Sequence, residues 1–239
     1  MNRFGQTAAT ALLALTLLLT GCGTQTAADT TAADTAAEEE LIEIKNGLDL
    51  PGYYYENNLT DKAADPFILC ADDTYYLYCT GGSRFSVRQT KYLNAWPSES
   101  KTILTLSALG WAREKGWAPE VYAYNGKYYM IFSAQGYNDL HAIDIAVCDT
   151  PDGNFKPLSS APFFAPDYSV IDGSLFFDDD GRIYMYYSKD NSTNIVGGKR
   201  TSQTYGVELE KDFSGIIGEP VLISTPEQEW EKKSGSVVW

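Results

Sequence analysis

Short runs of aromatic and β-branched residues recur along the chain, and they predict strands. The three clearest runs are residues 75–78, 128–132 and 183–187. Each follows turn-forming residues, and Asn125-Gly126 is a strong hairpin signal because both central residues of a type I′ turn need positive φ. Further strands are expected at residues 143–148, 204–209 and 220–223, with one short candidate helix at 104–114. The pattern predicts an all-β fold.

The hairpins repeat at intervals of about 50 residues, and each repeat opens with a carboxylate. Asp65, Glu120 and Asp172 are 55 and 52 residues apart. A repeat of this length made of paired strands is typical of β-propeller blades. From Asp65 to the last residue there is room for about three blades and the start of a fourth.

The repeated carboxylates are the candidate chemistry. Equivalent residues at the start of each blade's innermost strand meet at the mouth of the propeller channel. A pair of acids there can cleave a glycosidic bond, one as base toward water and one as acid toward the leaving oxygen. A third carboxylate can raise the acid's pKa by like-charge repulsion. The alternative is that Asp-Pro and Asp-Gly simply begin turns.

The N-terminus has the features of a targeting segment. Arg3 precedes an apolar run over residues 8–19, and Leu19-Thr20-Gly21-Cys22 resembles a bacterial lipobox. We therefore expect residues 1–22 to be a lipoprotein signal peptide with Cys22 as the lipidated residue, although an ordinary signal peptide with an incidental cysteine is the alternative. Residues 23–45, rich in Ala, Thr and acids, are expected to form a flexible tether, and residues 46–239 the partial propeller. A lipid anchor would hold the protein outside the cytoplasm, at the bacterial membrane or cell surface.

Composition narrows the choice of partners. The chain carries 32 acidic and 18 basic residues, a formal charge of −14, which argues against nucleic-acid binding. We expect Cys70, Cys79 and Cys148 to be buried as small apolar residues without a disulfide. No Cys/His spacing indicates a metal site, and no cofactor is expected. His141, the only histidine, lies in a polar stretch and is expected to be an ordinary surface or loop residue.

Five segments together carry a family likeness. In chain order they are residues 65–68 (DPFI), 92–96 (YLNAW), 117–121 (WAPEV), 146–155 (AVCDTPDGNF) and 171–181 (IDGSLFFDDDG). Each alone is a weak signal, but in this order they resemble the blade motifs of glycoside hydrolase family 43. The resemblance extends from about residue 60 to residue 239.

The resemblance implies a five-bladed propeller, here truncated, of the inverting arabinofuranosidase, xylosidase and arabinanase type. It implies that Asp65 is the general base and that Asp172 tunes the pKa of the general acid. Glu120 would have a supporting or sugar-binding role. Trp117 and Phe85 are candidates to line the sugar pocket, with packing between blades an equal alternative for Trp117. Neither the sugar nor a structural calcium ion in the channel can be read from these residues.

The likeness fails at the general acid, which in the family is a Glu usually followed by Gly-Pro. The sequence contains no Glu-Gly-Pro, and Glu227, Glu229 and Glu231 do not match the motif. The main hypothesis is the N-terminal part of a surface-anchored hydrolase acting on arabinose- or xylose-containing plant polysaccharides. The alternatives are a lipid-anchored glycan-binding protein or inactive fragment that lacks the acid, and another propeller glycosidase family.

Overall fold

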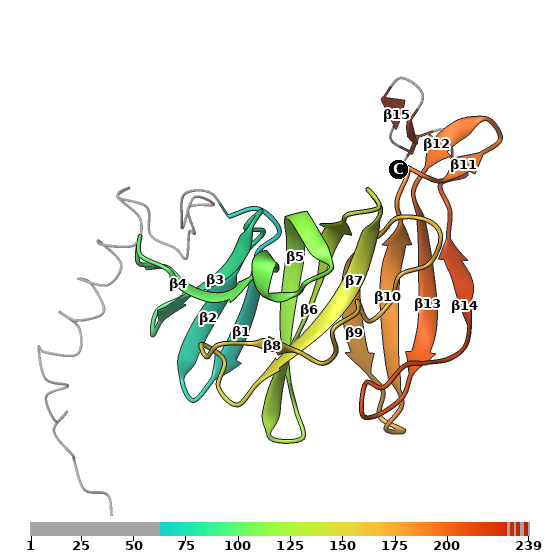
Figure 1. The fold of residues 1–239 in the computed structure, drawn as a ribbon. Coiled ribbons are helices and arrows are strands. Elements are labelled where there is room, and N and C mark those ends of the chain that lie inside the picture. Colours follow the sequence, from blue (N-terminus) through green and yellow to red (C-terminus); the bar gives the residue numbers. More distant parts are fainter. Residues whose placement is uncertain (1–62, 229, 232, 235–236, 239) are drawn as a thin grey trace, which may run out of the picture. The chain divides into compact units, whose positions relative to one another are not determined.

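The structure is a computed structural model that describes residues 63–228, 230–231, 233–234 and 237–238. All of these residues belong to one compact unit. The expected signal peptide, its Cys22 and the expected tether lie outside the described residues, as does Glu229. Within the described part, three four-stranded antiparallel sheets follow one another along the chain (Figure 1).

The first sheet forms a blade whose strands are adjacent in the order of the sequence. It consists of β1 (Phe67–Ala71), β2 (Thr74–Tyr78), β3 (Arg84–Thr90) and β4 (Lys101–Thr105). The turn between β1 and β2 is made by Asp72 and Asp73, which both have positive φ. Short-chain acids tolerate this conformation better than most residues, so the turn follows from the local sequence.

The second blade has the same order and longer strands. It consists of β5 (Ala112–Tyr124), β6 (Lys127–Gly136), β7 (His141–Cys148) and β8 (Lys156–Pro157). The expected Asn125-Gly126 turn joins β5 to β6, with φ values of 48° and 74°. The pairing of β5 with β6 shifts register three times between Ala112 and Glu120, so the first half of β5 is bulged.

The third blade pairs in the order β14-β13-β10-β9. Its strands are β9 (Val170–Phe177), β10 (Ile183–Lys189), β13 (Gln203–Leu209) and β14 (Ile216–Ser224). A hairpin of β11 (Ile195–Val196) and β12 (Lys199–Thr201) is inserted between β10 and β13. It forms a small fourth sheet with β15 (Lys233–Ser234) and β16 (Val237–Val238).

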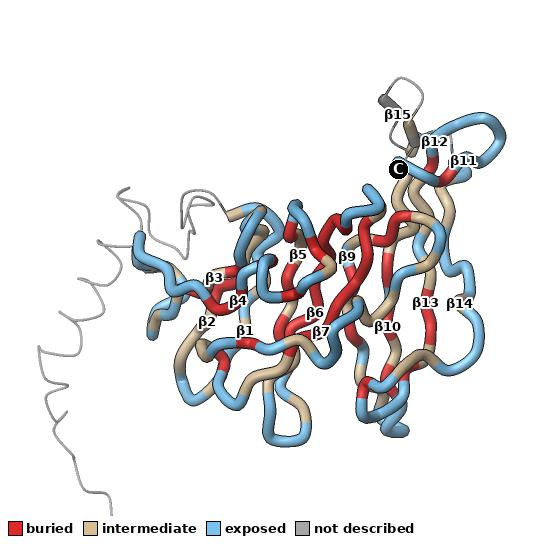
Figure 2. The backbone as a smooth tube through the Cα atoms, viewed as in Figure 1, coloured by how far each residue is buried: buried red, intermediate tan, exposed pale blue. Residues whose placement is uncertain are grey.

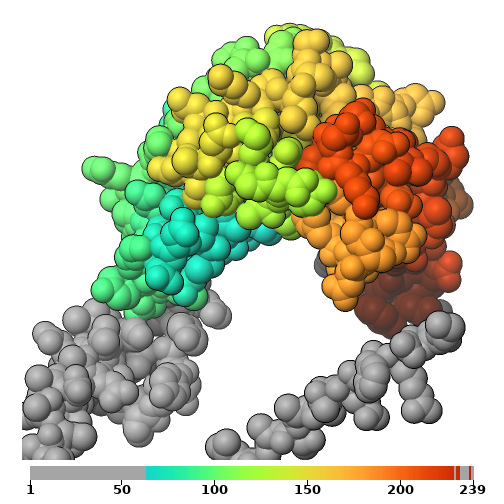
Figure 3. All heavy atoms as spheres, turned by 90° about the horizontal axis from the view of Figure 1, so that it is seen from below, coloured from blue at the N-terminus to red at the C-terminus, as the bar shows by residue number. Residues whose placement is uncertain are grey.

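The second blade lies between the other two, because β5 contacts β1, β2 and β3 on one side and β9 on the other. Figure 3 shows the same order in atoms, from the cyan and green residues of the first blade to the orange and red residues of the third. The first strands of the three blades are therefore neighbours, and residues at their beginnings can approach one another.

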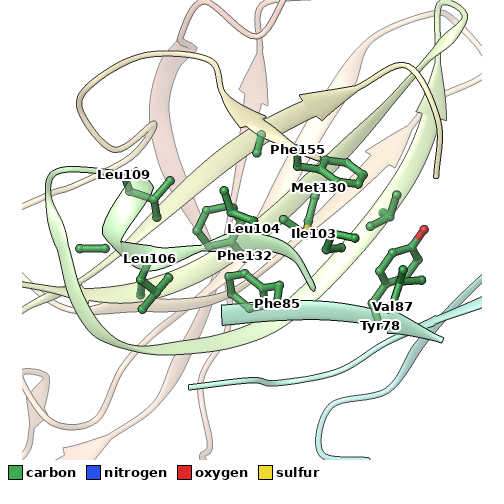
Figure 4. Close-up of a cluster of buried hydrophobic side chains, with 14 residues drawn as sticks. Tyr78, Phe85, Val87, Ile103, Leu104, Leu106, Leu109, Met130, Phe132 and Phe155 are labelled. Carbon is green, nitrogen blue, oxygen red and sulfur yellow. The ribbon is translucent and has the colours of Figure 1, made fainter. Parts of the chain in front are cut away.

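Two buried clusters hold the blades together, one at each junction, and the buried residues concentrate on the central strands (Figure 2). The cluster between the first and second blades contains fourteen residues, ten of which Figure 4 labels. Phe85 is one of them. It is fully buried, and its ring lies 4.9 Å from that of Phe132. The expectation that Phe85 lines a sugar pocket is therefore wrong, because a fully buried ring between blades cannot contact a sugar.

The helix expected at residues 104–114 is not formed. The segment contains only a 3-10 turn, η1 (Leu106–Ala108), between the end of β4 and the start of β5. Its apolar spacing arises because Leu106 and Leu109 enter the core at the blade junction.

The three cysteines of the described residues are unpaired, as expected, but they are not buried: Cys70 is exposed on β1, and Cys79 and Cys148 are half-buried. The alternating burial along β1 places Cys70 on the open face of the first blade. None of the helical segments in the described residues is long and apolar enough to cross a bilayer.

Candidate active site

One residue at the beginning of each blade adopts a left-handed backbone conformation. These residues are Asp65 (φ 49°), Ala118 (φ 45°) and Asp172 (φ 56°). They are 53 and 54 residues apart, so the structural repeat aligns Ala118, not Glu120, with the two aspartates. The conformation costs an alanine roughly 1–2 kcal/mol, so packing must impose it. Glu120 lies two residues further along β5.

Asp65 is held by a hydroxyl group. It is exposed to solvent, and its Oδ2 accepts a short hydrogen bond from Thr80 Oγ1. Thr80 lies two residues after the end of β2, and its own backbone N–H donates to the carbonyl of Ala64 (3.0 Å). The carboxylate therefore has a fixed support on the first blade while remaining open to water.

Asp172 lies on β9, and its backbone N–H donates to Ser133 Oγ on β6 (3.4 Å). Gly173 follows it for a steric reason. A Cβ there would lie 2.9 Å from Ile131 Cδ1 and 3.1 Å from Ile143 Cγ2. Glycine therefore suits position 173, where the third blade packs closely on the second.

The pKa of Asp172 is raised from its ordinary value of 3.8 to about 6. Burial of the carboxyl group is the largest cause, followed by the negative charges of Asp65, Asp190 and Glu120. These four acids come from three blades, so the convergence expected for Asp65, Glu120 and Asp172 is found in the structure. Like charges gathered in this way disfavour ionisation of a neighbouring acid and raise its pKa.

Glu120 is half-buried in a hydrogen-bond network. It accepts a short hydrogen bond from Tyr122 Oη, which lies 3.2 Å from Ser174 Oγ and accepts the N–H of Leu175 (3.3 Å). Burial, then the bond to Glu120, raises the pKa of Tyr122, so its hydroxyl stays protonated. The network fixes Glu120 across the junction between the second and third blades.

Asp190 is the acid that sequence reasoning missed. It follows β10 directly, donates its N–H to Ser169 O (2.9 Å), and accepts a short hydrogen bond from Ser192 Oγ. In the sequence it looks like an ordinary turn, since Asp and Ser commonly form such local bonds. Its place directly after β10, the second strand of the third blade, was the available signal.

Trp117 and His141 form a stacked pair, with ring centroids 4.5 Å apart and an interplanar angle of 23°. Trp117 is half-buried, so one face of its ring is occupied by the imidazole. His141 begins β7 and is only 6% exposed, which corrects its expected place on the surface or in a loop. Burial lowers its pKa, and its Nε2 has no hydrogen-bond partner among the described residues.

The four acids do not form a metal cluster. Among the described residues, no group of three or more His, Cys, Asp or Glu side chains is arranged to hold a metal ion. Their arrangement instead brings Asp65 near Asp172, whose pKa is raised, and both residues are exposed to solvent. Neighbouring carboxyl groups, one with a raised pKa, suit acid–base chemistry on a neutral substrate.

Comparisons with known proteins agree with this geometry. The sequence profile of "Glycosyl hydrolases family 43" matches residues 56–238. A thermostable family-43 glycoside hydrolase has a TM-score of 0.70 at 36% identity, covering 77% of this chain and 60% of that one. An endo-arabinase from Bacteroides thetaiotaomicron has a TM-score of 0.67 at 26% identity, covering 75% and 63%.

Curated relatives match over shorter segments. A xylosidase/arabinosidase 43A from Humicola insolens is 38% identical over 85 residues, which is 36% of this chain and 25% of that protein. A xylosidase/arabinosidase from Bacteroides ovatus is 28% identical over 144 residues, 53% of this chain and 43% of that protein. The chain thus spans less than half the length of these relatives. With the profile matching most of its length, the chain belongs to glycosyl hydrolase family 43.

Proposed function

We propose that the chain is the base-bearing part of an inverting glycoside hydrolase that acts on arabinose- or xylose-containing polysaccharides. The observation that carries the proposal is the convergence of Asp65 and Asp172, two acids exposed to solvent, together with the pKa of Asp172, which is raised to about 6. The relatives named xylosidase, arabinosidase and endo-arabinase support the substrate class.

In the proposed reaction, Asp65 takes a proton from water while the water oxygen bonds to the anomeric carbon. The bond from that carbon to the leaving oxygen breaks, and its electron pair stays on the leaving oxygen. A general acid then supplies a proton to that oxygen. Asp172, with Glu120 and Asp190 around it, provides the negative field that keeps a neighbouring acid protonated.

The alternative is a glycan-binding protein that keeps the acids without turnover. One observation favours it: the Glu-Gly-Pro motif that marks the family's general acid does not occur in this sequence. Losing a general acid typically costs about 10²–10⁴ in rate. The cost is smaller for a leaving group that departs without a proton, which makes the two functions separable by experiment.

The experiment compares 2,4-dinitrophenyl and 4-nitrophenyl glycosides of α-L-arabinofuranose and β-D-xylose. The hydrolase proposal predicts measurable turnover of a dinitrophenyl glycoside, because dinitrophenolate needs little protonation. Asp65→Asn should lower that turnover by about 10²–10⁴-fold to a residual rate, while Asp149→Asn, an exposed acid paired with Lys127, should leave it unchanged. Saturable binding of a glycoside with no turnover in the unaltered protein would instead establish the binding function.

We further propose that Cys22 is lipidated and anchors the protein outside the cytoplasm, on the strength of the lipobox-like sequence alone. Cys22→Ala should move the protein from the membrane fraction to the soluble fraction and remove the acyl mass from the mature N-terminus. An unchanged mass and distribution would refute the anchor.

A further inference from the structure

The hydroxyl of Thr80 has two partners on different blades. It donates to Oδ2 of Asp65 in the first blade, and it accepts the backbone N–H of Ala118 in the second blade (2.8 Å). A hydroxyl group has one proton to donate. A carboxylate oxygen can only accept this proton, and a backbone N–H can only donate, so the direction of both hydrogen bonds is fixed.

The hydrogen bond from Ala118 to Thr80 depends on the left-handed conformation of Ala118. Such a backbone is costly for alanine, and the N–H of Ala118 is bonded to the Thr80 hydroxyl. The second blade therefore orients a side chain of the first blade, and that side chain orients Asp65.

Backbone hydrogen bonds beside Thr80 keep the three segments in place. Gly82 and Gly116 form an antiparallel bridge, with Gly116 N–H donating to Gly82 O (2.7 Å) and Gly82 N–H to Gly116 O (3.1 Å). A Cβ on Gly116 would lie 2.9 Å from Phe85 Cζ, so only glycine allows the approach without rearrangement. This bridge joins the segment that carries Thr80 to the segment that carries Ala118, so backbone contacts keep the two residues close together.

The same device recurs one blade later. Ser133 stands 53 residues after Thr80, and its hydroxyl accepts the N–H of Asp172, which stands 54 residues after Ala118. This second bond is longer, at 3.4 Å. At both junctions a hydroxyl group on the second strand of one blade, or just beyond it, thus supports the left-handed residue of the next blade, which argues against a chance contact.

We propose that Thr80 is a positioning residue that fixes the Asp65 carboxylate and leaves its Oδ1 as the oxygen that receives the proton from water. The proposal deepens the function proposed above and rests on it. Oδ2 already accepts the threonine proton, whereas Oδ1 keeps both of its lone pairs available for the attacking water. Thr80 does not touch the substrate; it acts through Asp65.

The test uses Thr80→Val, which removes the hydroxyl at nearly constant shape, and Thr80→Ser, which restores it. On the dinitrophenyl glycoside, Thr80→Val should lower kcat by about 10–100-fold with little change in KM, since small misplacement of a catalytic group has effects of this size. Thr80→Ser should recover most of the loss. The matched control is Thr90→Val, which removes a half-buried hydroxyl bonded to the backbone of Tyr92 in the same blade and should leave kcat unchanged.

A double-mutant cycle separates positioning from general structural damage. In the Asp65→Asn background, Thr80→Val should cause no further loss of rate, because the group it positions is already gone. An equal additional loss in that background, or a Thr80→Val protein with unaltered kcat, would overturn the proposal.

Amide hydrogen exchange tests the link without turnover. Exchange at Ala118 should be faster in Thr80→Val than in the unaltered protein, Thr80→Ser or Thr90→Val; equal rates would overturn the link. If exchange behaves as expected but the unaltered protein cleaves no glycoside, the proposed function has failed, and the positioning role in catalysis falls with it. If the protein is active and only the Thr80 results fail, the proposed function stands alone.

Discussion

The buried carboxylate of Asp144 allows a quantitative test of charge burial in the second blade. Asp144 lies on β7 and is 1% exposed. Its Oδ2 accepts the indole N–H of Trp111 (2.9 Å), and its Oδ1 accepts the N–H of Ile145 (2.8 Å). Burial outweighs these hydrogen bonds and raises the pKa of Asp144 from 3.8 to about 6. At neutral pH the fold therefore carries an unfavourable buried charge.

The size of the cost follows from the pKa. At 1.36 kcal/mol per pH unit, a rise from 3.8 to about 6 corresponds to roughly 3 kcal/mol. The folded state binds the proton more tightly than the unfolded state. The stabilising contribution is therefore fully present below pH 3.8 and is lost as the pH rises through about 6.

Asp144→Asn keeps an oxygen acceptor for Trp111 but cannot ionise. At pH 7 the free energy of unfolding should increase by about 1–2 kcal/mol, because removal of the charge cost exceeds the roughly 1 kcal/mol lost when a charged acceptor becomes neutral. At about pH 4 the variant should be no more stable than the unaltered protein. Urea unfolding followed by tryptophan fluorescence at both pH values measures the difference.

Asp149→Asn is the control, because Asp149 is exposed and its pKa is lowered by Lys127, so its substitution should change stability little at either pH. The reasoning would be refuted if Asp144→Asn lowered the urea midpoint equally at both pH values. That result would mean that the ionised carboxylate stabilises the fold despite its burial.

Three further predictions test the core and the acid cluster. Phe85→Ala should destabilise the protein by about 3–5 kcal/mol in urea unfolding, because it leaves a cavity between two blades; a loss of sugar affinity without destabilisation would contradict this. Gly173→Ala should lower the free energy of unfolding by about 1–3 kcal/mol in the same assay, since the new Cβ would lie 2.9 Å from Ile131 Cδ1. An unchanged urea midpoint would show that the side chains between the second and third blades move aside at no cost. Asp65→Asn should lower the pKa of Asp172 from about 6 toward 3.8 by removing a nearby negative charge, as a ¹³C NMR titration of the carboxyl group would show; an unchanged pKa would mean that the charges do not interact.

Local signals in the sequence predicted most of the strands. The turns at Asp72-Asp73 and Asn125-Gly126 are formed as expected, because their residues tolerate positive φ at little cost. The alternating pattern of the strands then follows from burial on the blade faces. The segment at 104–114 failed because short-range apolar spacing does not distinguish a helix from a loop that enters a core.

The candidate site was predictable only where residue type and backbone conformation agree. Asp65 and Asp172 are both acids and both left-handed, so the sequence repeat located them. At the second blade the carboxylate pattern pointed to Glu120, whereas the left-handed residue is Ala118, a conformation that alanine does not signal. His141 was missed because its stacking partner, Trp117, is distant in the sequence and its neighbours are polar.

The first product formed from an aryl β-D-xyloside tests the central claim most directly. In the proposed reaction, water activated by Asp65 attacks the anomeric carbon in a single displacement, so ¹H NMR at early times should show α-xylose before mutarotation. Asp65→Asn should form it at least about 100-fold more slowly. If β-xylose appears first, or if the Asp65→Asn protein forms product at the unaltered rate, Asp65 is not the base and the account of the site is wrong.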